Sequence, residues 1–148
     1  MSNSHSLLNQ LVWVFQKSLK PKQENNFKIM NKNIKLQDLI KKAYLAFNSR
    51  DIDTALSTFH AEVQWPRAFE GGYVTGHHEV RKYWTKQWTE INPNVEPLAI
   101  IERPNGTFEV SVQQTVKDLQ SNIIFDGIVK HVFMVQDDLL RRMDIELG

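Results

Sequence analysis

His131 is the side chain in this sequence that is best suited to chemistry. It stands in the stretch GIVKHVFMVQ, where strand alternation puts it on one apolar face with Val129 and Phe133. An imidazole on such a face can donate a hydrogen bond to a ligand carbonyl or take a proton near neutral pH. It can also be a structural histidine satisfied by a neighbour such as Gln114, which falls on the inner face of its own strand. We name His131 as a candidate catalytic residue and expect it to be neutral at pH 7, because burial disfavours the charged ring.

Aromatic residues gather in the stretch VQWPRAFEGGYVTGHHEVRKYW, residues 63 to 84. This stretch runs from a short strand through a loop with paired glycines into a helix, which is typical of the rim of a ligand pocket. The aromatic faces could stack on a flat apolar ligand, and the same side chains could also form a packed core. The expected ligand-binding residues are Trp65, Phe69, Tyr73, Trp84, Gln114 and Phe133. Among them, the loop residues Phe69 and Tyr73 are the ones we expect to contact a ligand rather than the core.

Other polar residues do not combine into a site by their spacing. His77 and His78 are adjacent, and adjacent side chains on a helix do not face each other, so a metal pair is not expected. Asp144 should turn outward because its neighbours on both sides are apolar. Asp126 precedes a glycine, where a turn or bulge is as plausible as a site. We expect no metal and no cofactor.

Composition excludes several classes of protein. The chain has 148 residues, enough for one domain with a core of its own, and contains no cysteine, which excludes disulfides and thiolate chemistry. Its formal charge of +1 and the lack of a basic stripe argue against nucleic acid as a partner. The longest apolar run is far below the roughly 18 residues of a membrane-spanning helix. We expect no transmembrane segment and a cytoplasmic location.

The first 33 residues are expected to form an extension to the domain. In SLLNQLVWVFQKSLKPK, apolar residues recur at helical spacing and lysines follow, which predicts a short amphipathic helix at most. A secretory signal would carry its positive charge ahead of the apolar residues, so none is expected. Three interpretations remain: a peripheral membrane or partner-binding helix, a flexible or loosely docked extension, or sequence upstream of a start at Met30. The domain is expected to span residues 34–148.

The domain reads as helices followed by strands. Leu36, Ile40, Ala43 and Phe47 make an apolar stripe with Asn33 as N-cap, which predicts the first helix. Asp51 can cap a second short helix, and a third begins at Gly76. After His60 the apolar period changes to two. Beyond Pro93, long strands are predicted over residues 95–104, 107–119, 123–136 and 139–147, with a tight turn at Asn105 and Gly106. This order predicts an α+β fold with helices on one face of an antiparallel sheet.

Three stretches together resemble the nuclear transport factor 2-like superfamily, and in particular its ketosteroid isomerase-like and SnoaL-like small proteins. They are AYLAFNSRDIDTALSTFHAEVQWP, GGYVTGHHEVRKYWTKQW and GIVKHVFMVQDDLLRRMDIE. The resemblance implies a cone, in which a strongly bent antiparallel sheet wraps around the N-terminal helices and encloses a pocket. It also implies a homodimer, since many such proteins pair through the open sheet face. The outward residues Leu98, Ile100 and Val132, which are apolar, favour that pairing.

The resemblance does not extend to the catalytic residues of the isomerases. The position of the family's catalytic carboxylate matches Trp65, and an indole cannot act as a base. The family's tyrosine aligns with Ala43, and one residue along a helix turns a side chain by about 100°, so Tyr44 should point elsewhere. The family's oxyanion-binding aspartic acid aligns with His131. Ketosteroid isomerisation is therefore not expected.

Two functions of different classes follow from these residues. The first is a protein that binds a small apolar or aromatic ligand, of unknown specific activity. The alternative is an isomerase, cyclase or hydratase that acts on a small organic molecule, with His131 as proton donor or base. A buried acid paired with His131 would favour the enzyme, whereas a pocket filled by Trp65 and Trp84 would favour a non-catalytic binding or assembly domain.

Overall fold

The computed structural model describes residues 3–18, 20–68 and 70–147. The chain divides into two compact units, Met1–Lys35 and Leu36–Gly148. The helix α2 (Pro21–Asn48) runs through the point of division. The candidate site lies wholly in the second unit.

The first unit consists of α1 (Asn3–Ser18) and the beginning of α2. The helix α2 starts at Pro21, so the prediction that it begins after an N-cap at Asn33 is wrong. A proline in the first turn is favourable, because its fixed φ suits a helix and its missing N–H would have no partner there. The following residues KQENNFKIMNKN include several good helix formers, and they continue the helix without an apolar period.

Three helical segments belong to the second unit: the end of α2, α3 (Ile52–Ser57) and α4 (Gly76–Gln87). Asp51 caps α3 as predicted, since its Oδ1 accepts a hydrogen bond of 3.2 Å from the backbone N–H of Thr54. None of the helices within the described residues is long and apolar enough to cross a membrane.

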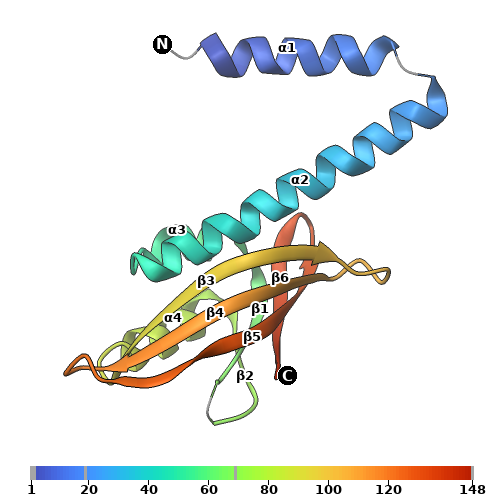
Figure 1. The fold of residues 1–148 in the computed structure, drawn as a ribbon. Coiled ribbons are helices and arrows are strands. Elements are labelled where there is room, and N and C mark those ends of the chain that lie inside the picture. Colours follow the sequence, from blue (N-terminus) through green and yellow to red (C-terminus); the bar gives the residue numbers. More distant parts are fainter. Residues whose placement is uncertain (1–2, 19, 69, 148) are drawn as a thin grey trace. The chain divides into compact units, whose positions relative to one another are not determined.

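A curved, six-stranded sheet makes up the rest of the second unit (Figure 1). Its strands are β1 (Phe59–Pro66), β2 (Tyr73–Thr75), β3 (Ile91–Glu102), β4 (Phe108–Asp118), β5 (Ile123–Gln136) and β6 (Leu139–Glu146). Their order in the sheet is β2-β1-β6-β5-β4-β3. The α+β class is confirmed, but the sheet is mixed, because β1 and β6 run parallel while all other pairs are antiparallel.

The long strands follow the predicted bounds closely, except at the start of β3. This strand begins at Ile91 and therefore contains Pro93, which was expected to lie before it, as well as Pro97, which the predicted range already included. Since β3 is an edge of the sheet, a proline can be accommodated with its missing N–H on the open side. The predicted turn at Asn105 and Gly106 joins β3 to β4, and Gly106 has the left-handed φ of +85° that such a turn requires.

The inner face of the sheet and the helices share one apolar core. Its members are Leu36, Ile40, Ala43 and Tyr44 from α2, Val80 and Trp84 from α4, and inward strand residues such as Val110, Val112, Val129 and Phe133. The outer face departs from expectation at two places. Ile100 pairs with Val110 and packs against the core, so its predicted outward orientation is wrong. Val132 is only 8% exposed, whereas Leu98 is 55% exposed, as expected of an outward residue.

Candidate functional site

A cavity lies among α2, β1, α4 and the inner face of the sheet. The cavity has a volume of about 40 Å³, and the empty space in and around it, which includes open solvent, is about 330 Å³. Its lining is almost wholly apolar and aromatic: Ala43, Tyr44, Phe47, Phe59, Trp65, Trp84, Val95, His131 and Phe133. We call it the inner cavity.

A second cavity adjoins the inner one, and we call it the outer cavity. Its volume is about 50 Å³, and the empty space in and around it, which includes open solvent, is about 490 Å³. The two share Phe47, Trp65, Val95 and His131 in their linings. The outer cavity is also lined by Gln114, Tyr83 and Gln87, so it is the more polar of the two. Because His131 and Trp65 line both, a molecule in either cavity would meet them.

The inner cavity contains one buried hydrogen bond between side chains, from Tyr44 to His131. The Tyr44 Oη and His131 Nδ1 atoms are 2.7 Å apart, and the two ring planes differ by only 9°. Tyr44 comes from α2 and His131 from β5, and they are 5% and 4% exposed. This bond ties the helix to the inner face of the sheet at the cavity wall.

Burial sets the protonation of both groups. It lowers the pKa of His131 to about 4 and raises the pKa of the Tyr44 hydroxyl well above its ordinary value. At pH 7 the imidazole is therefore neutral and the phenol keeps its proton. Since the bare nitrogen of a neutral imidazole is a better acceptor than a phenol oxygen, the Tyr44 hydroxyl donates to Nδ1. The imidazole proton then lies on Nε2.

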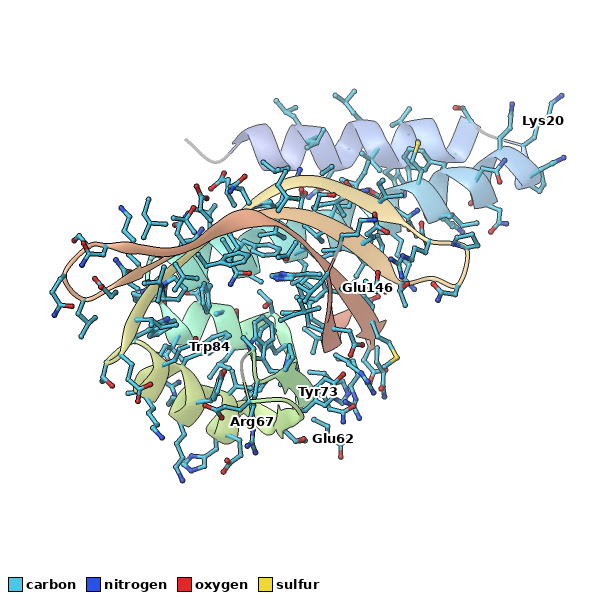
Figure 2. The ribbon with its side chains drawn as sticks, turned by 60° about the horizontal axis from the view of Figure 1, so that its bottom comes forward. Lys20, Glu62, Arg67, Tyr73, Trp84 and Glu146 are labelled. Carbon is cyan, nitrogen blue, oxygen red and sulfur yellow. The ribbon has the colours of Figure 1, made fainter. Side chains whose placement is uncertain are left out.

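Four aromatic side chains interlock beside this pair. Trp65 stacks on Phe59 with ring centroids 5.2 Å apart, and meets Trp84 edge to face at 5.3 Å. Phe47 meets Trp84 from the other side at 5.2 Å. Trp84 is 1% exposed and lies among the enclosed side chains in Figure 2. Its indole N–H is buried and has no acceptor within the described part of the chain.

The predicted ligand-binding residues separate into two groups. Trp65, Trp84 and Phe133 line the inner cavity and Gln114 lines the outer one, so the fold brings these four together around His131. Phe69 lies outside the described residues. The predicted partnership between Gln114 and His131 is not formed, because His131 bonds to Tyr44 instead.

Tyr73 lines neither of these cavities. Its hydroxyl donates to Asp144 and accepts a hydrogen bond of 2.8 Å from Arg142 Nη2. The Arg142 guanidinium also lies 4.6 Å from the centre of the Tyr73 ring. The hydrogen bond to Asp144 is the largest cause of the raised pKa of Tyr73. Asp144 itself faces away from the core, as its place in the strand predicts.

Tyr44 is the functional candidate that the sequence prediction missed. It was expected to point away from the interior, and this is wrong: both Ala43 and Tyr44 are buried and line the inner cavity. The end of α2 buries a wide arc of its surface, so a step of about 100° from Ala43 still falls within it. The spacing of Leu36, Ile40 and Tyr44 at i, i+4 and i+8 is the pattern that could have identified it.

Among the residues that the structure describes, no group of three or more His, Asp or Glu side chains could hold a metal ion. Nor are His77 and His78 paired: the His77 Nε2 atom lies 2.9 Å from the carbonyl oxygen of Phe59, which ties the start of α4 to β1.

No protein-family model and no curated protein matches the sequence. Solved structures do match the fold. TerC co-crystallised with polyporic acid is 21% identical, with 77% of this chain and 92% of TerC covered at a TM-score of 0.67. An NTF2-like protein of unknown function from Burkholderia pseudomallei is 19% identical, with coverages of 77% and 91% and a TM-score of 0.68. A Mycobacterium tuberculosis protein in complex with estradiol-17beta-hemisuccinate is 8% identical, with coverages of 77% and 94% and a TM-score of 0.66.

These structures match the chain over most of their own length, and the region they share with it is the size of the second unit. The predicted resemblance is confirmed at the level of the fold: the chain has the nuclear transport factor 2-like fold.

Proposed function

We propose that this protein binds a small, flat, uncharged molecule that is apolar or aromatic and carries a hydrogen-bond acceptor. The observation that carries the proposal is the Tyr44–His131 hydrogen bond in the wall of an aromatic cavity. Aromatic walls favour a flat ligand, because ring faces stack with offset or edge-on geometry. Trp65, Trp84 and Phe133 supply those walls.

The polarity of the inner cavity determines which kind of polar group the ligand can carry. The lining includes the imidazole of His131 and the indole of Trp84, whose N–H has no acceptor among the described residues, and it includes no Lys, Arg, Asp or Glu. A carboxylate or phosphate would lose its hydration without meeting an opposite charge, which is costly. A carbonyl, quinone or ether oxygen would accept from these donors at little cost.

Two structural relatives support the flat, aromatic character of the proposed ligand. TerC was co-crystallised with polyporic acid, and the Mycobacterium tuberculosis protein is in complex with estradiol-17beta-hemisuccinate.

The alternative function, an isomerase, cyclase or hydratase, has less support. No acidic side chain contacts His131 in the described part of the chain, and a His131 pKa of about 4 makes the ring a weak proton acceptor near pH 7. Trp65 and Trp84 meet edge to face in the lining of the inner cavity, which supports a binding protein. If a reaction is found, His131→Gln tests the alternative: a loss of about 100-fold or more in the chemical step would establish proton transfer by His131.

Three matched probes test the binding proposal: 9-fluorenone, fluorene and fluorene-9-carboxylate. They share a flat ring system and differ in the acceptor and the charge. Titration followed by tryptophan fluorescence or calorimetry should give tightest binding for fluorenone, with fluorene about tenfold weaker for want of one hydrogen bond. The carboxylate should bind least. Equal affinities for all three, or no binding of any, would contradict the proposal.

Two variants test whether the probe binds in the inner cavity. Tyr44→Phe removes the hydroxyl that fixes the His131 tautomer, so it should reduce the preference for fluorenone over fluorene. Tyr73→Phe is the matched control, because it removes a hydroxyl that is bonded to Asp144 and Arg142 and lies in neither cavity lining. A loss of preference in the control would place the probe elsewhere.

We also propose a homodimer that pairs through the outer face of the sheet. Four exposed apolar side chains support it: Leu98, Ile101, Ile128 and Met134, which are 42% to 64% exposed. Covering such a face with a second copy removes apolar area from water. Light scattering at tens of micromolar should give twice the mass of one chain, and Ile128→Lys should lower it. A monomer mass would contradict this proposal.

We propose the cytoplasm as the location, supported by the lysines of the N-terminal segment, which follow its first apolar stretch instead of preceding it. Recovery of the protein from the medium of intact cells would contradict it.

A further inference from the structure

The first unit exposes its apolar residues. None of its described side chains is buried, although two helices are present. Eight large apolar side chains of this unit are each more than half exposed: Leu7, Leu8, Leu11, Trp13, Val14, Ile29, Met30 and Ile34. Isolated helices of this length are marginal in water, and their stability normally comes from burying an apolar face. Something outside the unit is needed to cover these residues.

The apolar residues of α1 are gathered on one side of the helix. At about 100° per residue, Val14, Leu7 and Leu11 lie within about 60° of one another, and Leu8 follows on the same side. The opposite side carries Asn9, Gln10 and Lys17 together with Trp13, whose ring lies 4.3 Å from the Lys17 ammonium group. Such a helix can place one side in an apolar medium and keep the other in water.

Charge is distributed unevenly between the two units. Residues 1–35 contain six lysines, Lys17, Lys20, Lys22, Lys28, Lys32 and Lys35, and a single acid, Glu24, for a net charge of +5. Since the whole chain carries +1, the remaining residues carry −4. The exposed apolar residues and the positive charge therefore occur in the same segment.

We propose that residues 1–35 dock on an anionic membrane surface. The apolar side of α1 enters the boundary between headgroups and acyl chains, and the lysines approach lipid phosphates and carboxylates. A lipid surface fits better than a protein groove, because the exposed apolar residues occur on both helices and the lysines are spread over nearly twenty residues. A fluid lipid surface can contact all of these apolar residues and lysines, whereas a protein groove binds the apolar residues along one narrow face of a helix. This inference is independent of the ligand proposed for the cavity.

Sedimentation of the full chain with vesicles tests the proposal. Phosphatidylcholine vesicles with phosphatidylserine should bind at least about tenfold more tightly than phosphatidylcholine alone, and added salt should weaken the binding. The triple variant Lys20→Gln, Lys22→Gln, Lys28→Gln should lose about 100-fold, on the basis of the contribution of each lysine near an anionic surface. The double variant Leu8→Glu, Leu11→Glu should lose more than about tenfold.

Leu45→Glu is the matched control. Leu45 lies on the same chain, is 72% exposed and belongs to the second unit, so the same chemical change there should leave vesicle binding unaltered. Equal binding to both kinds of vesicle, absence of binding, or an equal loss in the control would overturn the proposal. The proposal would also be overturned if the Leu8→Glu, Leu11→Glu variant had half the molecular mass of the wild type in solution. A second copy of the chain would then cover the apolar residues of the first unit.

Discussion

The two halves of α2 have different surroundings along one continuous helix. From Leu36 to its end, the helix buries Leu36, Ile40, Ala43 and Tyr44 against the sheet, and Tyr44 reaches the cavity wall. From Pro21 to Lys35, none of its side chains is buried. Local propensity is enough to continue the backbone hydrogen bonds of a helix, but only contact with the sheet fixes a side chain in one place. The proposed functions of the two regions follow this difference: a fixed site in one, an adaptable surface in the other.

The largest expected effect comes from comparing one tryptophan from each unit, Trp84 on α4 and Trp13 on α1. Trp84→Ala should lower the free energy of unfolding by about 3–5 kcal/mol, because Trp84 is 1% exposed and contacts four aromatic rings. Trp13→Ala, at a residue that is 58% exposed, should change it by less than about 0.5 kcal/mol. Urea denaturation followed by circular dichroism measures both. Similar losses in the two variants would mean that α1 is packed in solution.

Titration of His131 should give the next effect in size. The folded-state pKa is about 4 and the ordinary value is 6.5, so between these values the unfolded state binds the proton and the folded state does not. Stability therefore falls as the pH is lowered through this window, by about 3 kcal/mol at most. His131→Gln removes this titration and leaves the carboxylates that also titrate in acid.

The measurement is the free energy of unfolding of both proteins from pH 7 to pH 4. The wild type should lose more than His131→Gln, and the difference should develop below pH 6.5. Parallel curves would show that His131 is exposed in solution, which would break the contrast between the fixed site and the adaptable segment.

A smaller effect is expected from the hydroxyl of Tyr44. Tyr44→Phe leaves the buried Nδ1 of His131 without its donor and should cost about 1–3 kcal/mol. Tyr73→Phe removes hydrogen bonds at a more exposed position, where water can replace them, and should cost less than about 1 kcal/mol. Thermal or urea unfolding compares the pair, and an equal cost would mean that water reaches the Tyr44–His131 pair.

Sequence patterns predicted what depends on neighbours along the chain. The alternation in residues 123–136 identified β5 with its bounds and placed His131 inward, and the Asp51 cap and the turn at Gly106 followed from local turn chemistry. The predicted inward face of β5 agrees with the structure. If β5 paired with its neighbours one residue out of register, every apolar side chain on that face would point to solvent.

Contacts between distant parts of the chain were not predictable in this way. The orientation of Tyr44 depends on how wide an arc of α2 the sheet covers, and a periodic stripe gives only the centre of that arc. Tyr73 is held by Arg142, about seventy residues away, and no local pattern links the two. The parallel pairing of β1 and β6 is non-local for the same reason. The start of α2 at Pro21 was not predicted, because the residues before Leu36 are helical by their intrinsic helix propensity and show no apolar period.

The smallest expected effect comes from removing the residues ahead of Met30. Because none of their described side chains is buried, and burial on α2 starts only at Leu36, the shortened chain should melt within about 2 °C of the full chain. Its far-UV circular dichroism should lose helix signal in proportion to the residues removed, and any binding to anionic vesicles should disappear, while affinity for fluorenone is kept. A truncated protein that is insoluble, or that melts many degrees lower, would show that the first unit is docked on the core. That outcome would remove the contrast between the two halves of α2, and it would leave residues 1–33 as part of the domain instead of the extension that the sequence predicts.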